Sequence, residues 1–241
     1  MGLIRNLFSV DGLIQLLYFL PIFLITITVH ECAHGYAAYK MGDPTAKMMG
    51  RLTLNPLKHM DPFGFIMLMI IGFGWAKPVM INPRNFRNPK RGMAISSLAG
   101  PASNILMAML GAVILGLLNY VGKANGIVYL DLKSLSFYAG ASGNSSVFMM
   151  ALTFFYQFMT MNTYFAVFNL IPIPPLDGSR IATYFLPPKL GYYYNYVERY
   201  GFLVLILLIN FTGLRYFLQF VVGLIISGIT FVLNFVPFLM L

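Results

Sequence analysis

Long apolar stretches constrain the fold of this 241-residue chain more than any other feature of its sequence. A helix needs about 20 apolar residues to cross the hydrocarbon core of a bilayer, and several stretches reach or approach that length. Only 10% of the residues are charged, whereas a typical soluble domain has about 25%. We therefore predict an all-α polytopic membrane protein with about five transmembrane helices, at residues 12–40, 93–121, 148–171, 197–213 and 214–238.

Two smaller elements are expected between these helices. The apolar segment Phe63–Trp75 is short and contains glycine, which favours a re-entrant segment over a full span. Arg51–Leu54 and Pro78–Ile81 are bounded by turn residues and predict a small β-sheet at the membrane surface. We expect residues 1–241 to form one membrane-embedded domain, with a core at about 12–185 and additional helices at about 197–238. No cleavable signal peptide is expected, because no cleavage site formed by small residues follows the first apolar run.

The basic residues predict how the chain is oriented in the membrane. Nine Lys or Arg lie between Lys40 and Arg91, against two acidic residues, whereas residues 122–146 hold only two lysines. Loops rich in Lys and Arg stay in the cytoplasm, so the first loop is expected inside and the second outside. The net charge of +9 then reflects this bias, and we expect no nucleic-acid partner.

The first predicted helix contains an H-E-x-x-H motif, formed by His30, Glu31 and His34. Residues four apart lie on one helix face, about 6 Å apart along the axis, so the two imidazoles can share one metal ion. Glu31 would lie beside them and could take a proton from water that the metal activates. The alternative is that these residues lie at a helix end and bind no metal, but ionisable residues within a span are usually functional.

A catalytic zinc site has three protein ligands and one open position, and Asp177 is one candidate for the third. It follows a span that ends in three prolines, which break the helix, on the same side of the membrane as His34. From the residues alone, an N-cap for a short helix starting at Ser179 is an equally good interpretation. His59 is predicted at the surface, and the single cysteine, Cys32, is predicted to pack.

Two asparagines lie in or at the end of predicted spans. Asn104 lies within the second span and Asn169 ends the third. Both could form hydrogen bonds between helices, or they could bind substrate and support the transition state beside the metal.

Three motifs in this order resemble the site-2 protease family of intramembrane zinc metalloproteases. They are H-E-x-x-H at 30–34, G-P-x-x-N at 100–104, and N-x-x-P-x-P-x-L-D-G at 169–178. The resemblance implies that Asp177 is the third ligand of one Zn²⁺ per chain and that Asn104 lies near the active site. It also implies a lipid environment and substrates that are transmembrane proteins, and the compact form of the chain favours a prokaryotic cell membrane. The PDZ and CBS modules of some relatives are not found here.

We further expect a strand within residues 78–86 to pair with the unwound substrate. The alternatives are a non-proteolytic protein of the same fold, a metal transporter, and a CAAX-type protease that takes its third ligand from Glu198. The oligomeric state is left open by the sequence.

Overall fold

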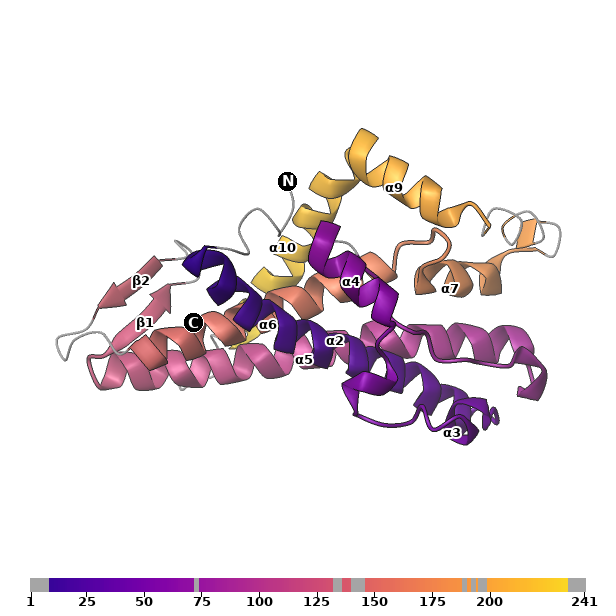
Figure 1. The fold of residues 1–241 in the computed structure, drawn as a ribbon, viewed down its shortest axis with the longest axis horizontal. Coiled ribbons are helices and arrows are strands. Elements are labelled where there is room, and N and C mark those ends of the chain that lie inside the picture. Colours follow the sequence, from indigo (N-terminus) through magenta and orange to yellow (C-terminus); the bar gives the residue numbers. More distant parts are fainter. Residues whose placement is uncertain are drawn as a thin grey trace.

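The computed structural model describes residues 9–71, 74–131, 136–139, 146–187, 190–191, 194 and 199–233. Three long helices form its centre: α2 (Val10–Lys40), α5 (Pro89–Ala124) and α6 (Ser146–Asn169). Helix α5 packs against both α2 and α6, and α2 also contacts α6. Figure 1 shows α5 as the longest element, with α2 crossing it and α6 running beside it.

Local sequence signals explain where two of these helices begin. The Ser9 side chain accepts a hydrogen bond from Gly12 N–H at 3.1 Å, and the Asn88 side chain accepts one from Arg91 N–H at 3.1 Å. Such caps satisfy N–H groups that have no partner within the helix. In α5, Pro89 occupies the first helical position, where its missing N–H costs nothing.

Three helices in the described part of the chain are long and apolar enough to cross a membrane: Gly12–Lys40, Pro89–Ala124 and Leu214–Val232. They lie in α2, α5 and α10 (Leu214–Leu233). The predicted span at 148–171 is helical as α6, but it is not among these three. Within the described part of the predicted span at 197–213, the helix is α9 (Gly201–Phe211). Its 11 residues extend about 16 Å, about half of a hydrocarbon core. The count of five spans therefore stays a prediction.

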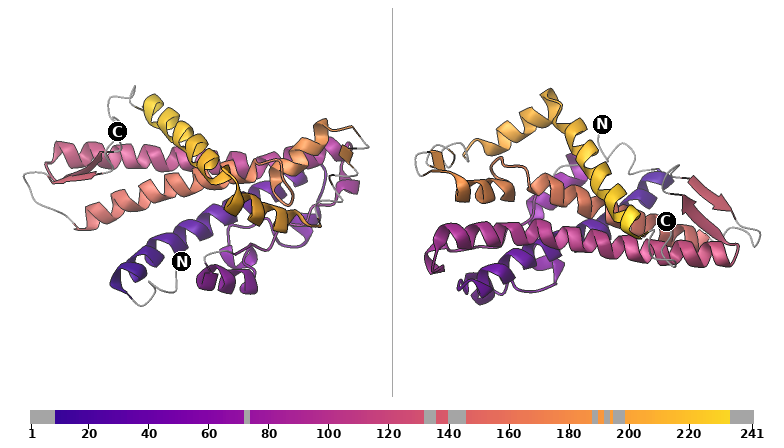
Figure 2. Two further views of the ribbon diagram at one scale, coloured as in Figure 1. Left: turned by 90° about the horizontal axis from the view of Figure 1, so that it is seen from above. Right: turned by 180° about the vertical axis from the view of Figure 1, so that it is seen from behind.

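Helices α9 and α10 lie over the C-terminal half of α6 (Figure 2). Their contact is apolar, with Leu205, Leu218 and Val222 packed against Val167 and Ile171. A second apolar cluster fills the interface between α5 and α6, where Ala108, Ala112, Leu115, Leu152 and Met159 are buried. Between helices in a lipid environment, such contacts stabilise the fold through close van der Waals packing.

The two ends of the predicted re-entrant segment lie close together. It forms helix α4 (Pro62–Ile71), and its two ends are joined by a bridge between Met60 and Ala76. Gly64 and Gly74 allow the close return, because a Cβ atom at Gly74 would lie 2.2 Å from the Gly64 carbonyl oxygen. This out-and-back path agrees with a re-entrant segment, although residues 72–73 fall outside the described residues.

A small sheet exists, but its predicted position is wrong. Strands β1 (Val128–Asp131) and β2 (Ser136–Ala139) pair antiparallel at the end of α5 farthest from helix α7 (Asp177–Phe185) (Figure 1). Arg51–Leu54 and Pro78–Ile81 contain no strand. Two backbone N–H groups near the second stretch bond to side-chain carboxylates instead: Val79 N–H to Glu31 and Asn82 N–H to Asp43.

The remaining short elements lie in the loop between α2 and α5. They are helix α3 (Thr45–Met48) and the 3₁₀ turns η1 (Pro56–Lys58) and η2 (Pro83–Asn85). Asn55 and Asn82 cap the two 3₁₀ turns. This loop positions Lys77–Asn82, which has no helix, turn or bend, beside α2.

Candidate metal centre

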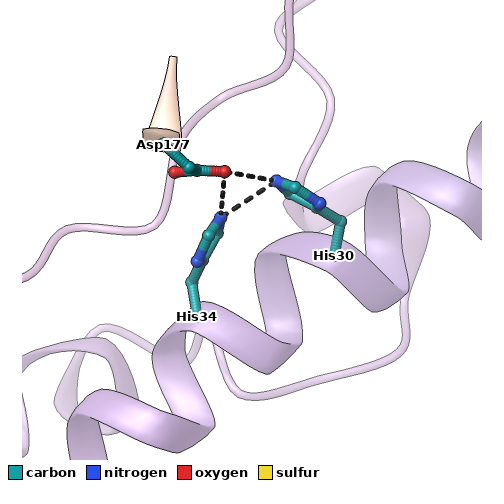
Figure 3. Close-up of side chains that lie close together, drawn as sticks. All are labelled: His30, His34 and Asp177. Atoms are coloured by element: carbon teal, nitrogen blue, oxygen red, sulfur yellow. Dashed lines mark hydrogen bonds and ion pairs between the residues drawn. The ribbon is translucent and has the colours of Figure 1, made fainter. Parts of the chain in front are cut away.

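His30 and His34 lie one turn apart on α2 and point at the same place. Their Nε2 atoms are 2.9 Å apart, and Asp177 Oδ2 lies 3.1 Å from each. Figure 3 shows the carboxylate of Asp177 facing the two imidazoles. The two histidines are only 3% and 7% exposed. The structure therefore brings together the three residues that the sequence offers as ligands.

Asp177 reaches this place because the chain folds back sharply after α6. A Cβ atom at Gly178 would lie 2.2 Å from the Leu170 carbonyl oxygen, so only glycine permits this approach of α7 to the end of α6. The N-cap of α7 is Leu176, and Asp177 is its first helical residue. The alternative interpretation of Asp177 as the N-cap of a helix starting at Ser179 is therefore wrong.

Helix α5 passes directly over the two imidazoles. A Cβ atom at Gly100 would lie 2.4 Å from His34 Nε2 and 2.7 Å from His30 Cε1. Phe165 of α6 closes another side, with its ring edge-on to His30 at 5.0 Å between centroids. Three helices thus enclose the ligand atoms.

The other imidazole nitrogens are held by hydrogen bonds. His34 Nδ1 lies 2.7 Å from the carbonyl oxygen of Ser96, and His30 Nδ1 lies 2.6 Å from Asn104 Oδ1. Because a carbonyl oxygen only accepts, His34 Nδ1 must be the donor, and its Nε2 then presents a lone pair. Metal-binding histidines are oriented in this way by an outer partner.

The donor set fits zinc. Asp177 Oδ2 is buried without a hydrogen-bond donor, and it meets two imidazole nitrogens at 3.1 Å. Three acceptors that converge in this way form a set that can hold a cation between them. Tetrahedral zinc with ligands about 2.0–2.2 Å away separates its donors by about 3.3–3.6 Å, so small outward movements suffice.

Glu31 lies next to the ligands and is anchored by the loop. Its Oε2 accepts a hydrogen bond from Val79 N–H at 2.8 Å. Glu31, the three ligands, Asn169 and Arg180 all line a cavity of about 170 Å³. This arrangement can hold a metal, a water molecule and a base in one polar cavity.

The two predicted asparagines lie in different surroundings. Asn104 is fully buried between helices, and its amide bonds to His30, to the Thr26 carbonyl oxygen and to Asn162. Asn169 lines the cavity, and its Nδ2 donates to the Phe165 carbonyl oxygen at 2.9 Å. Asn104 therefore contacts a candidate ligand directly, whereas Asn169 lines the cavity beside the candidate ligands.

Several contacts at the site were missed by the sequence analysis. Arg180 lies three residues after Asp177, and this helical spacing could have indicated a place at the same cavity. Val79 and Ser96 act through backbone atoms, which no motif reveals. His59, predicted at the surface, is fully buried, with Nε2 2.8 Å from the Thr53 carbonyl oxygen. Cys32 is half-buried on α2, and Glu198 lies outside the described residues.

Over most of its length the chain is similar to a peptidase family and to proteins named as putative zinc metalloproteases. The model of peptidase family M50 matches residues 18–209. "Putative zinc metalloprotease YwhC" of Bacillus subtilis (strain 168) is 39% identical over 191 residues, which are 79% of this chain and 79% of that protein. "Putative zinc metalloprotease Rip2" of Mycolicibacterium smegmatis is 29% identical over 204 residues, which are 82% of this chain and 69% of that protein. No solved structure matches this chain.

The matched region includes both the helix that carries H-E-x-x-H and Asp177. It confirms the resemblance seen in the sequence. This chain belongs to peptidase family M50, the site-2 protease family of metalloproteases.

Proposed function

We propose that this chain is an intramembrane zinc metalloprotease that hydrolyses peptide bonds within or near transmembrane helices of other membrane proteins. His30, His34 and Asp177 hold one Zn²⁺ per chain, and Glu31 is the general base. The observation that carries the proposal is the meeting of three buried acceptor atoms within 3.1 Å beside a glutamate in a polar cavity.

The chain's own residues then divide the work of hydrolysis. Bound zinc supplies Lewis-acid chemistry, which makes water more acidic and polarises a peptide carbonyl. Glu31 takes the proton from water and later gives it to the departing amine. The hydrogen bond from Val79 N–H to Oε2 fixes the carboxylate and leaves Oε1 for this proton.

An unwound substrate needs hydrogen-bond partners that lipid does not supply. We propose that it pairs with the segment Lys77–Asn82, which lines one side of the cavity through Pro78, Val79 and Ile81. The Val79 N–H is already bonded to Glu31, whereas the Met80 backbone has no hydrogen bond within the described residues. Met80 is also 55% exposed, so its N–H and C=O are the groups offered to a substrate strand.

Met80→Pro tests this pairing because it removes the N–H and leaves the other backbone groups in place. Cleavage is expected to slow while zinc stays bound, whereas Met80→Ala, which keeps the N–H, is expected to cleave normally. Equal cleavage by the two variants would remove the pairing from the proposal.

The proposed orientation rests on the charged loops. The loop between α2 and α5 carries the basic residues, and these favour the cytoplasmic side. The candidate metal centre lies toward that end of α2, since only Lys40 and five other residues follow His34 in the helix. We therefore propose an active site open toward the cytoplasm of a prokaryotic cell. The two similar proteins named above are bacterial.

The alternative functions have less support. A non-proteolytic relative would be expected to lose the base or a ligand, and this chain keeps Glu31, His30, His34 and Asp177. Membership of a peptidase family does not favour a metal transporter. A third ligand from Glu198 is tested by substituting Glu198 and Asp177 separately.

The decisive experiment measures zinc content and cleavage together. Purified wild-type protein is expected to contain about one zinc per chain, and Asp177→Ala is expected to lose it. Glu31→Gln is expected to keep the zinc and to lose cleavage of a transmembrane substrate. Asp131→Ala, in β1 at the far end of α5, is the matched control and is expected to keep both.

Two results would refute the proposal. One is wild-type protein that is folded and contains no zinc after purification with zinc present. The other is unchanged zinc content in Asp177→Ala, which would show that the carboxylate is not a ligand.

A further inference from the structure

A chain of buried amides links the candidate metal centre to a helix that supplies none of its ligands. Asn162 lies on α6, Asn104 on α5 and His30 on α2, and all three are between 0% and 3% exposed. Asn162 Oδ1 is 3.0 Å from Asn104 Nδ2, and Asn104 Oδ1 is 2.6 Å from His30 Nδ1. Each contact fixes which atom donates in the next.

The orientation of the Asn162 amide is set within its own helix. Asn162 Nδ2 donates to the carbonyl oxygen of Phe158 at 2.9 Å. A carbonyl oxygen cannot donate, so the nitrogen of Asn162 must face Phe158 and its oxygen must face Asn104.

The Asn104 amide is then fixed in turn. Its Nδ2 meets two oxygens, Asn162 Oδ1 at 3.0 Å and the Thr26 carbonyl oxygen at 3.3 Å. Its Oδ1 is therefore the atom that faces His30, and the hydrogen at this contact must belong to His30 Nδ1. This leaves His30 Nε2 with a lone pair directed at Asp177.

Comparison with the second histidine shows why the hydrogen bond between Asn104 and Asn162 is needed. His34 Nδ1 bonds to the Ser96 backbone carbonyl, which cannot exchange a donor for an acceptor. The partner of His30 is a side-chain amide, and rotation by half a turn would present Nδ2 instead. His30 Nδ1 would then have to accept, and the proton would move to Nε2, the atom that must bind the metal. Without Asn162, only the longer contact to Thr26 opposes this rotation.

We propose that Asn162 is a positioning residue that holds His30 in the tautomer with the proton on Nδ1, and so prepares His30 Nε2 to bind the metal. The metal-binding part of this inference rests on the proposed function, whereas the tautomer is a property of the metal-free protein.

The tautomers can be read by ¹⁵N NMR of metal-free protein labelled at histidine, at alkaline pH. The chain has only three histidines, and substitution of each assigns its signals. His30 and His34 are expected with the proton on Nδ1. His59 is expected with the proton on Nε2, because Nε2 faces the Thr53 carbonyl oxygen at 2.8 Å, and it serves as an internal reference.

Asn162→Leu removes both hydrogen bonds and keeps the same branched side-chain shape. The His30 signals are expected to shift toward a mixture of tautomers, while His34 and His59 stay unchanged. Zinc affinity, measured by competition with a chelator, is expected to fall about 10–100-fold, as for other outer partners of metal ligands. Asn162→Thr is a milder variant whose hydroxyl can bond to Phe158 but cannot reach Asn104, and the same changes are expected.

Two controls separate positioning from general packing. Asn119→Leu removes another fully buried asparagine of α5, which bonds to the Leu130 backbone at 2.9 Å through both amide atoms, and the His30 tautomer is expected to stay unchanged. Asn162→Asp keeps an acceptor oxygen for Asn104 and is expected to retain the wild-type tautomer.

The proposal is overturned if His30 keeps the proton on Nδ1 in both Asn162→Leu and Asn162→Thr. It is also overturned if Asn119→Leu changes the His30 tautomer as much as Asn162→Leu does. Because the tautomer is read without metal, a wild-type protein that binds no zinc would refute the proposed function and leave this test intact.

Discussion

Gly100 offers a direct way to perturb the metal centre without changing a ligand. A Cβ atom added there would lie 2.4 Å from His34 Nε2 and 2.7 Å from His30 Cε1. Carbon atoms pack at about 3.5–4.0 Å, so Gly100→Ala requires a movement of about 1 Å between α5 and the rings. Metal sites hold their ligands to within about 0.2 Å of ideal distances. A shift of this size should therefore disrupt the site.

The expected result is a loss of zinc and of cleavage that exceeds the loss of stability. Overpacking alone costs about 1–3 kcal/mol, whereas a 1 Å misplacement of catalytic groups lowers activity by about 100-fold. Zinc content, cleavage of a transmembrane substrate and thermal unfolding would be measured on the same Gly100→Ala preparation.

Two alanine variants make this experiment specific. Gly111→Ala adds a Cβ atom 2.8 Å from Phe158 Cδ1, so it overpacks α5 away from the metal and is expected to lower stability but keep zinc. Gly223→Ala meets no atom within 4 Å and is expected to be neutral or slightly stabilising. Wild-type zinc affinity and activity in Gly100→Ala would refute the reasoning that α5 packs against the ligand rings.

Three further outcomes are expected. Asp43 is fully buried and accepts hydrogen bonds from Thr45, Asn82 and Asn85, so Asp43→Ala should loosen Lys77–Asn82 and slow cleavage while zinc content is unchanged. Burial raises the pKa of the Asp43 carboxyl, but the hydrogen bonds from Thr45, Asn85 and Asn82 lower it by more than burial raises it, so the net pKa lies below the usual value. The stabilising contribution of the Asp43 carboxylate is thus complete above the unfolded pKa of about 3.9 and is lost as pH falls through the folded pKa. The melting temperature of Asp43→Asn should therefore fall less on acidification than that of wild type. Removal of zinc with a chelator should lower the free energy of unfolding by about 2.7 kcal/mol, compared with protein in free zinc at 100 times the Kd. An unchanged melting temperature would contradict a metal bound only by the folded state.

The features that could be predicted from sequence are those that depend on the spacing of residues along one helix. The i, i+4 spacing of His30 and His34 places both rings on one helix face in any α-helix, and α2 bears this out. Asp177 is more distant, and spacing alone left it between a cap and a ligand. The family resemblance favoured the ligand, and the sharp return of the chain at Gly178 provides the physical reason that a loop acid reaches α2.

The outer partners could not be predicted because they depend on how the helices are rotated against one another. A rotation of α6 by one residue, about 100°, would turn Asn162 away from Asn104. Nothing in the local sequence distinguishes Asn162 from Asn119, which holds β1 instead. The same limit applies to Ser96, whose contribution is a backbone carbonyl.

The errors in the loop between α2 and α5 have two causes. Local composition predicts strands at Arg51–Leu54 and Pro78–Ile81 and an exposed His59, but His59 is buried by contacts within the loop, to Thr53 and Lys77. In the structure, carboxylates at and beyond the end of α2 accept hydrogen bonds from this loop, through Glu31 at Val79 and Asp43 at Asn82. The loop is thereby held against α2, and the base of the proposed reaction is one of its anchors. Any substrate strand that displaces Val79 would also release Glu31, so we expect substrates to bind along Met80 without disturbing the Val79 contact.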